Sequence, residues 1–125
     1  MKKEEFLKYF ELCQGKETSL ALDGNDKRLI SEIRNHCFIS MARIGQEYAR
    51  AKDYIQKRYL VYKTNKDING KSLSIDDANA MAEKDYMDNN EVSRRELEWL
   101  LEALKQGCNA CASRLSVLGD EGRGV

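Results

Sequence analysis

The chain contains no proline and only one histidine among its 125 residues. At the average frequency of about 5%, roughly six prolines would be expected. Because proline interrupts helices and is common in irregular segments, its absence favours a mostly helical chain. Long uninterrupted apolar runs are also missing, since the longest run covers only a few residues. A membrane-spanning helix needs about 20 apolar residues, so the sequence excludes one.

The N-terminal segment MKKEEFLKYF lacks the apolar block of a secretory signal peptide, so we expect a cytoplasmic protein. The length corresponds to a single domain. Hydrophobic residues make up 42% of the chain and charged residues 34%, which is typical of a soluble, folded protein.

Catalytic motifs are missing as well. The sequence has no glycine-rich phosphate-binding loop and no nucleophile motif. His36, the single histidine, precedes Cys37, but adjacent helical residues point about 100° apart and do not form an aligned dyad. We therefore expect neither enzymatic activity nor a cofactor.

The four cysteines include a Cys-x-x-Cys motif, Cys108 to Cys111, with a spacing found in redox pairs and zinc sites. Both residues coincide with apolar positions of a predicted helix, where a small apolar side chain is favourable. We favour buried thiols and expect no metal. A metal site or a redox pair is the alternative, with Cys13, Cys37 and His36 as further ligands.

The net charge of zero conceals a separation of charge along the chain. Residues 27–66 contain ten Lys or Arg and three Asp or Glu, a net charge of +7. Residues 67–102 contain four bases and ten acids, a net charge of −6. The basic segment permits a local anionic partner.

Heptad spacing predicts two long helices, one from about residue 26 to 63 and one from about 91 to 118. Apolar residues recur at alternating intervals of four and three, interrupted in the first helix only by Arg58. These seam positions, which we assign to the core or to an oligomer interface, include Cys37, Met41, Ile44, Tyr48, Ile55, Tyr62, Leu97, Leu101, Leu104 and Leu115.

Shorter elements are expected around these helices. A short helix is predicted over residues 2–13, followed by a break through GKETSLALDGND, and Asn69-Gly70 is typical of a turn. Ser74 is expected to begin another short helix, and residues 119–125 to form a flexible tail. The predicted fold is all-α: an elongated antiparallel helical hairpin with short packing helices, in one domain over residues 1–118.

The first long helix would span roughly 57 Å at 1.5 Å per residue. A compact domain of this size has a radius of gyration of only about 14 Å, and the second helix is shorter. We expect a second copy of the chain to cover the excess seam, and hence a homo-oligomer.

A basic stripe is predicted on the outer side of the first helix, where Arg43, Glu47, Arg50, Tyr54 and Lys57 alternate at intervals of four and three. Aromatic rings among cations suit sequence-tolerant binding of single-stranded nucleic acid, through base stacking and phosphate neutralisation. Tyr48 and Tyr62 belong to the core seam instead. The candidate DNA-binding residues are Arg43, Arg50, Tyr54, Lys57, Arg58, Tyr59, Lys63 and Lys66, and Lys71 extends the charge into the turn.

The acidic middle segment, with Asp76, Asp77, Glu83, Asp85 and Asp88, is interpreted as a solvated face or a counter-surface for the basic helix. Paired carboxylates also bind divalent ions, but the alternating ligands of a calcium loop are missing.

The run QKRYLVYKTNKDING, the acidic helical segment after it and the amphipathic C-terminal helix with Trp99 resemble small phage recombination mediators of the UvsY type. Members of that family carry a Lys/Arg run that closes on adjacent tyrosines and a glycine turn. Here Leu60 and Val61 separate the tyrosines, and Gly70 comes later than in the family pattern. The matching positions are Lys57, Arg58, Tyr59, Tyr62 and Lys63.

The resemblance implies an all-helical phage protein acting in the cytoplasm of a bacterial host. It further implies a ring-shaped oligomer that binds single-stranded DNA and helps load a RecA-like recombinase onto strands coated by single-strand-binding protein. The competing class is a helical adaptor, or an inhibitor of a host defence complex, that binds proteins through the acidic 76–102 face and no nucleic acid. Charge reversal at Arg50, Lys57 and Arg58 tests the first class, and changes at Asp85, Asp88 and Glu91 test the second.

Overall fold

The structure is a computed structural model that describes the backbone of residues 1–123 and the side chains of residues 1–15 and 18–119. Its helices confirm the all-α class: α1 (Lys3–Gln14), α2 (Lys16–Asp23), α3 (Lys27–Thr64), α4 (Ile75–Met87) and α5 (Arg94–Arg123). Within the described residues, no helix combines the length and apolar character needed to cross a membrane.

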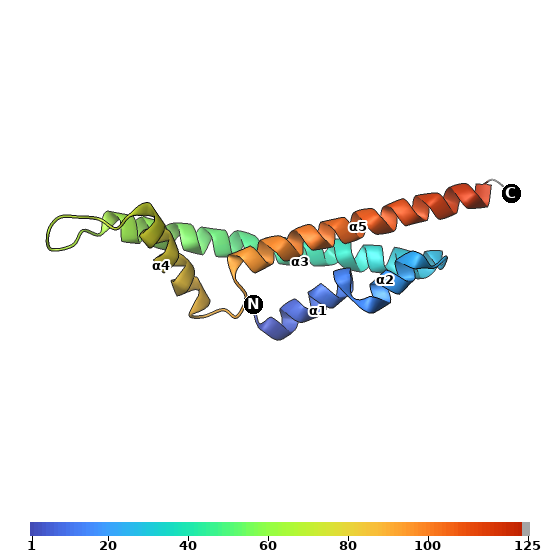
Figure 1. Cartoon of the computed structure of the whole chain (residues 1–125), viewed down its shortest axis with the longest axis horizontal. Coiled ribbons are helices and arrows are strands. Elements are labelled where there is room, and N and C mark those ends of the chain that lie inside the picture. Colours follow the sequence, from blue (N-terminus) through green and yellow to red (C-terminus); the bar gives the residue numbers. More distant parts are fainter. Residues whose placement is uncertain (124–125) are drawn as a thin grey trace.

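The two long helices, α3 and α5, lie side by side and run in opposite directions (Figure 1). Cys108, midway along α5, donates a hydrogen bond through its thiol to the Arg34 carbonyl in the first part of α3, at 3.7 Å. The three shorter helices pack against this pair, and the molecule is elongated (Figure 1).

Helix α3 has nearly the bounds that the heptad spacing predicts. The Asp26 carboxylate caps its first turn by accepting a hydrogen bond from the Leu29 amide at 3.1 Å. The helix ends before the Asn69-Gly70 turn, where Gly70 takes a φ of 77°, a conformation that glycine adopts without steric cost.

Helix α5 begins later and ends later than predicted. It starts at Arg94 and continues through Gly119 to Arg123, so the predicted tail of residues 119–125 is helical as far as 123. A glycine costs a helix only about 1 kcal/mol relative to alanine, too little to end a helix of this length. Residues 124–125 lie outside the described part.

The predicted break through GKETSLALDGND is wrong for most of its length, because residues 16–23 form α2. The extended backbone of Gly15, with φ −71° and ψ 162°, is the only interruption between α1 and α2. The Thr18 hydroxyl donates to the Leu12 carbonyl at 2.7 Å and links the start of α2 to the end of α1.

The predicted seams form the core of the single chain. Cys37, Ile44 and Ile55 of α3 are buried together with Leu97 and Leu104 of α5. The remaining seam residues pack against this cluster or the smaller one around Ile30 while partly exposed: Met41, Tyr48, Tyr62, Leu101 and Leu115.

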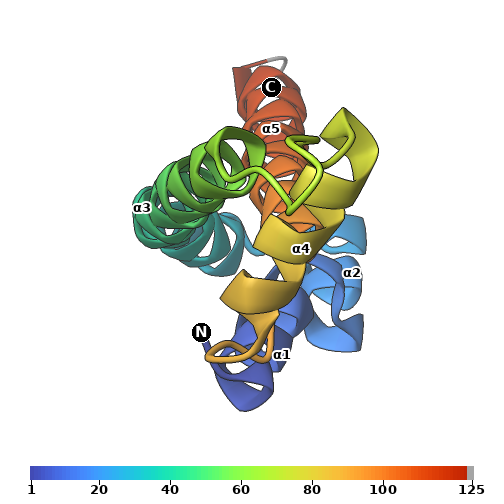
Figure 2. The ribbon, with the colours of Figure 1, turned by 90° about the vertical axis from the view of Figure 1, so that its left-hand side faces the viewer.

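Helix α4 covers the part of α3 that extends beyond α5. Its buried residues Ala78, Ala82 and Tyr86 face α3, and the Tyr86 ring lies 6.0 Å from the Tyr54 ring. Figure 2 shows α4 and α5 on the same side of α3. The excess seam is therefore covered within the chain, and the predicted homo-oligomer needs a different surface.

Candidate nucleic-acid interface

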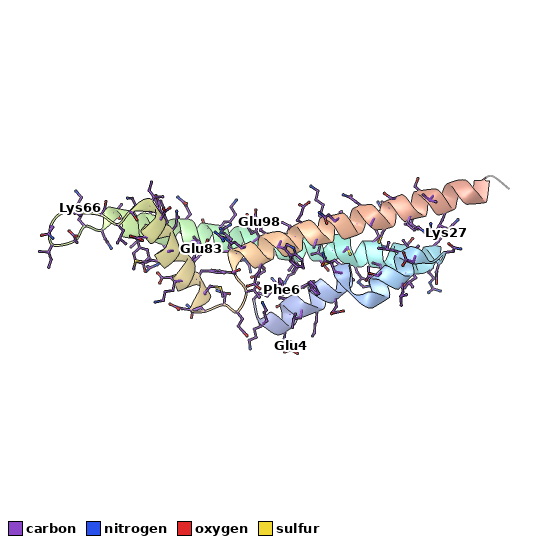
Figure 3. The ribbon with its side chains drawn as sticks, viewed as in Figure 1. Glu4, Phe6, Lys27, Lys66, Glu83 and Glu98 are labelled. Carbon is purple, nitrogen blue, oxygen red and sulfur yellow. The ribbon has the colours of Figure 1, made fainter. Side chains whose placement is uncertain are left out.

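The predicted DNA-binding residues extend along α3 from Arg43 into the following turn, where Figure 3 shows Lys66 at one end of the molecule. The 23 positions between Arg43 and Lys66 correspond to roughly 35 Å of helix. The middle of the stripe and its end have different surroundings.

The middle of the stripe is neutralised within the chain. Arg43 forms ion pairs with Glu47 of its own helix and with Glu5 of α1, the latter at 3.2 Å. Glu47 also accepts a hydrogen bond from Arg50 at 3.3 Å. The hydrogen bond that Arg43 donates to Glu47, more than the nearby charges, raises the pKa of Arg43 above its ordinary value. This side of α3 is therefore a contact with α1 rather than a free cationic face.

Tyr54 lies at the border of this region, with 40% of the residue exposed. Its ring borders a cavity of about 290 Å³. Tyr86 and Asp85 of α4 and Arg50 of α3 also line this cavity. Burial raises the pKa of Tyr86 above its ordinary value. The structure thus pairs Tyr54 with Tyr86, which leaves Tyr54 only partly accessible to a base.

Arg58 and Tyr62 share the carboxylate of Asp85 from α4. The Arg58 Nε donates to Asp85 at 3.0 Å, and the Tyr62 hydroxyl donates to the same oxygen. The hydrogen bond from Tyr62, followed by that from Arg58, holds the pKa of Asp85 below its ordinary value. The hydrogen bonds that Arg58 donates to the Tyr62 hydroxyl and to Asp85 raise the pKa of Arg58. The positive charge of Arg58 is thus compensated within the fold.

The cations nearer the end of α3 are more accessible. Lys57 pairs with Asp53 at 2.8 Å, but both side chains are mostly exposed, and such surface pairs contribute little. Lys63 donates to the Leu73 carbonyl at 2.7 Å and ties α3 to the far side of the turn. Tyr59 is half-buried against the core, so its ring is only partly available for stacking.

The turn after α3 is internally braced. The Asp67 carboxylate accepts hydrogen bonds from the amides of Asn69 and Lys71, at 2.8 and 2.9 Å. An isolated antiparallel bridge joins Lys66 to Ser72 across the turn. The Asp67 carboxylate therefore stabilises the conformation of the turn through these two hydrogen bonds.

This bracing places Lys66 and Lys71 beside one small cavity of about 220 Å³, which Tyr62, Asn65, Asp67, Ser72 and Leu73 also line. The Asp67 carboxylate at this cavity is the one that binds the amides of the turn. Within the described part of the chain, neither lysine forms an ion pair. Ammonium, amide, hydroxyl and phenol groups around a concave surface are suited to phosphate and sugar oxygens. We call this surface the tip site.

The sequence interpretation did not include Asn65 and Ser72. It assigned Tyr62 to the core seam, although the family resemblance also includes this residue. The signal that identifies Asn65 and Ser72 is the Asn69-Gly70 turn, because residues flanking such a turn pair across it. Tyr62 in fact has both roles, since it packs on the core and lines the tip site.

The four cysteines come from three helices to one place. Cys13 of α1 and Cys37 of α3 both approach Gly107 of α5, at 3.7 and 3.4 Å from the position that a Cβ would take. Burial, and then the neighbouring Cys108, Cys111 and Cys13 thiols, raise the pKa of Cys37 to about 12. The thiol of Cys37 therefore stays protonated and packs as a small apolar group. Among the described side chains, no group of three is placed to hold a metal ion.

The acidic segment serves in part as the predicted counter-surface. Asp85 pairs with Arg58 of α3, and Glu83 pairs with Arg94 of α5 at 2.8 Å. Asp76, Asp77 and Asp88 remain exposed.

Comparison with protein-family models, curated proteins and solved structures finds no match for this chain. The resemblance to UvsY-type mediators therefore stays a prediction that rests on residues 56–63 and on the order of the elements.

Proposed function

We propose that this protein binds single-stranded DNA through the tip site and acts as a recombination mediator. The observation that supports this most directly is the pair of lysines, Lys66 and Lys71, which flank one cavity and form no ion pair in the described structure, since the Asp67 carboxylate beside them binds backbone amides. The tip site also overlaps the run that resembles the mediator family, because Tyr62, Asn65 and Lys66 belong to both. The proposed binding surface includes fewer residues than the basic stripe predicted from the sequence, and it lies at the C-terminal end of that stripe.

The chemistry of the tip suits a strand of any sequence. The two lysines neutralise phosphates, while the exposed Lys57 adds a third cation one or two turns back along α3. Ile68 is fully exposed in the turn and offers an apolar contact to a sugar or base. Such contacts carry no base code, so binding should be sequence-tolerant.

A single tip offers few phosphate contacts and binds weakly. An oligomer that presents several tips to one strand binds more tightly, because the second contact is made at high effective concentration. The step of recombinase loading is carried over from the family resemblance, with a RecA-like recombinase as the protein partner.

The test is a fluorescence-anisotropy titration of a labelled single-stranded oligonucleotide at several salt concentrations. We expect the double charge reversal Lys66→Glu/Lys71→Glu to weaken binding at least tenfold at low salt. The slope of log affinity against log salt should fall by about 1.4, since each lost contact to single-stranded DNA removes roughly 0.7.

Lys105→Glu is the matched control, because Lys105 is an exposed lysine of α5 away from the tip. Equal loss of binding in this control and in the tip variant would show that only overall charge matters. A folded wild-type protein that does not bind at low salt would remove the proposal and favour the adaptor class. In that case Asp88 and Glu91, which are exposed, are the residues to change, whereas Asp85 is occupied in the fold.

A further inference from the structure

A second heptad repeat lies on the surface of α3. Ser31, Asn35, Phe38, Ala42, Gly45 and Ala49 follow one another at intervals of four and three, and none is charged. We call these six residues the outer face. The members from Phe38 onward each follow a residue of the core seam, so the outer face is turned by about 100° from that seam. Charged residues make up 34% of the chain, yet those between Ser31 and Ala49 all lie outside the outer face.

The outer face is uncovered in the single chain. Phe38 is 71% exposed and its neighbour Ile39 is 68% exposed. Ala42 and Ala49 are exposed, and no atom lies within 4 Å of a Cβ placed on Gly45. Figure 2 shows α3 at one edge of the molecule, with the other helices on its opposite side. Two adjacent large apolar side chains on a rigid helix mark an interaction surface.

The sizes of the side chains indicate what covers this face. Two copies of α3 that cross antiparallel, with a two-fold axis between Arg43 and Ile44, place Phe38 opposite the partner's Ala49. The same axis places Ala42 opposite the partner's Gly45. Each layer then combines an a position with a d position, as antiparallel coiled coils require, and the large ring meets a small residue. A parallel pairing would instead set Phe38 against itself and leave a gap at Gly45.

We propose that the outer face, over residues 38–49, binds the same residues of a second copy of this chain in this antiparallel, two-fold register. The surface is self-complementary, which a two-fold interface demands. This proposal supplies the oligomer that the proposed function uses, but it does not depend on DNA binding. A dimer that does not bind DNA would overturn the proposed function and leave the proposed dimer intact. A monomer that binds DNA would overturn the dimer and leave the proposed function intact.

The first experiment measures the molar mass of the whole protein by sedimentation equilibrium, without DNA. We expect the wild type to form dimers or multiples of dimers. Phe38→Glu should raise the dissociation constant roughly 1000-fold, since the symmetric interface loses two aromatic anchors. Gly45→Leu should also dissociate the dimer. It leaves the chain itself unstrained, because the space around Gly45 is open.

Ile75→Glu is the matched control, since Ile75 is 61% exposed in the first turn of α4 and the substitution removes a similar apolar surface. It should keep the mass of the wild type, and circular dichroism should show unchanged helix content in all variants. A monomeric wild type at tens of micromolar would overturn the proposal. A Phe38→Glu variant with the mass of the wild type would overturn it equally.

The second experiment tests the register. Chains carrying Ala42→Cys and chains carrying Gly45→Cys are mixed and oxidised mildly, and the disulfide-linked products are weighed by mass spectrometry. The proposed axis brings residue 42 of one copy opposite residue 45 of the other, so the mixed disulfide should dominate. Products linked mainly 42 to 42 or 45 to 45 would show a parallel or shifted pairing and overturn the register.

Discussion

Asp85 is the residue that joins α4 to α3. Its carboxylate accepts hydrogen bonds from both Arg58 and Tyr62, and the Arg58 guanidinium lies 5.2 Å from the centre of the Tyr62 ring. The two partners are 27 and 23 positions away in the sequence. Arg58 is the one interruption of the first heptad seam, and this carboxylate explains how the fold tolerates it.

The pairing predicts a pH dependence of stability. The pKa of Asp85 is lowered in the folded state, so the ionised form stabilises the fold above the unfolded pKa of about 3.9. That contribution is lost as the pH falls through the lower folded value. We expect Asp85→Asn to be less stable than the wild type at pH 7, and the difference to shrink below about pH 4.

Urea unfolding of both proteins from pH 7 to pH 3 measures this difference. Asp88→Asn is the control, since Asp88 is exposed and forms no ion pair within the described structure. A difference between wild type and Asp85→Asn that stays constant over the whole pH range would contradict an ionised Asp85 in the fold.

At the scale of the element, the start of α5 is fixed by a reciprocal capping box. The Ser93 amide donates to the Glu96 carboxylate at 3.1 Å, and the Glu96 amide donates to the Ser93 hydroxyl at the same distance. Ser followed three residues later by Glu is typical of a helix start, and this pair sets the first residue of α5 at Arg94 rather than near residue 91. Hydrogen bonds from Lys3 and from Ser93 hold the pKa of Glu96 below its ordinary value.

Loss of the Ser93 cap should be measurable. We expect Ser93→Ala to lower the free energy of unfolding by about 1 kcal/mol, as for other helix caps. Ser113→Ala is the control, because Ser113 is exposed inside α5 and alanine is the better helix former. It should be neutral or slightly stabilising in urea unfolding, and an equal cost at both serines would contradict the capping role.

Helix α2 shows where element-scale reasoning from sequence fails. Its two flanking glycines, Gly15 and Gly24, and its eight residues suggest a loop. An isolated helix of that length is marginal in water, so its formation depends on packing. Ala21 and Thr18 are buried in the structure, and Arg114 of α5 donates to the Gly24 carbonyl at 3.1 Å. None of these contacts can be read from the local pattern.

At the scale of the whole molecule, α1 closes on the start of α5 through aromatic rings. Trp99, the single tryptophan, lies 5.5 Å from the Phe10 ring in a stacked arrangement and 6.5 Å from the Phe6 ring. Phe6 is buried, and Lys3 pairs with Glu96 beside it. The N-terminal amino group also donates to the Asn90 side chain at 2.8 Å.

Phe6→Ala should therefore separate α1 from the helical pair. We expect a loss of about 3 kcal/mol in the free energy of unfolding, typical of removing a buried ring, and a red shift of Trp99 fluorescence in the folded state. Leu7→Ala is the control in the same helix, since Leu7 is 51% exposed and should change stability by less than about 0.5 kcal/mol. Similar losses in both variants would contradict the docking of α1 through Phe6.

From the sequence alone one can predict the helical class, the bounds of α3, the turn at Asn69-Gly70 and the residues that form the seam. These features depend on local rules: the absence of proline, the period of the apolar residues, the caps and the conformation of glycine. Such rules involve residues that are close together in the sequence, so they can be applied without knowledge of the tertiary structure.

The tertiary structure alone decided which charges of the basic stripe are free. Arg43 and Arg58 meet carboxylates from other helices, while Lys66 and Lys71 gather beside one cavity. It also decided that α4 covers the end of α3, which moved the expected contact between copies to the outer face around Phe38. Ion pairs and burial between distant segments depend on how the helices pack, and a periodic pattern does not specify which helix will lie against which.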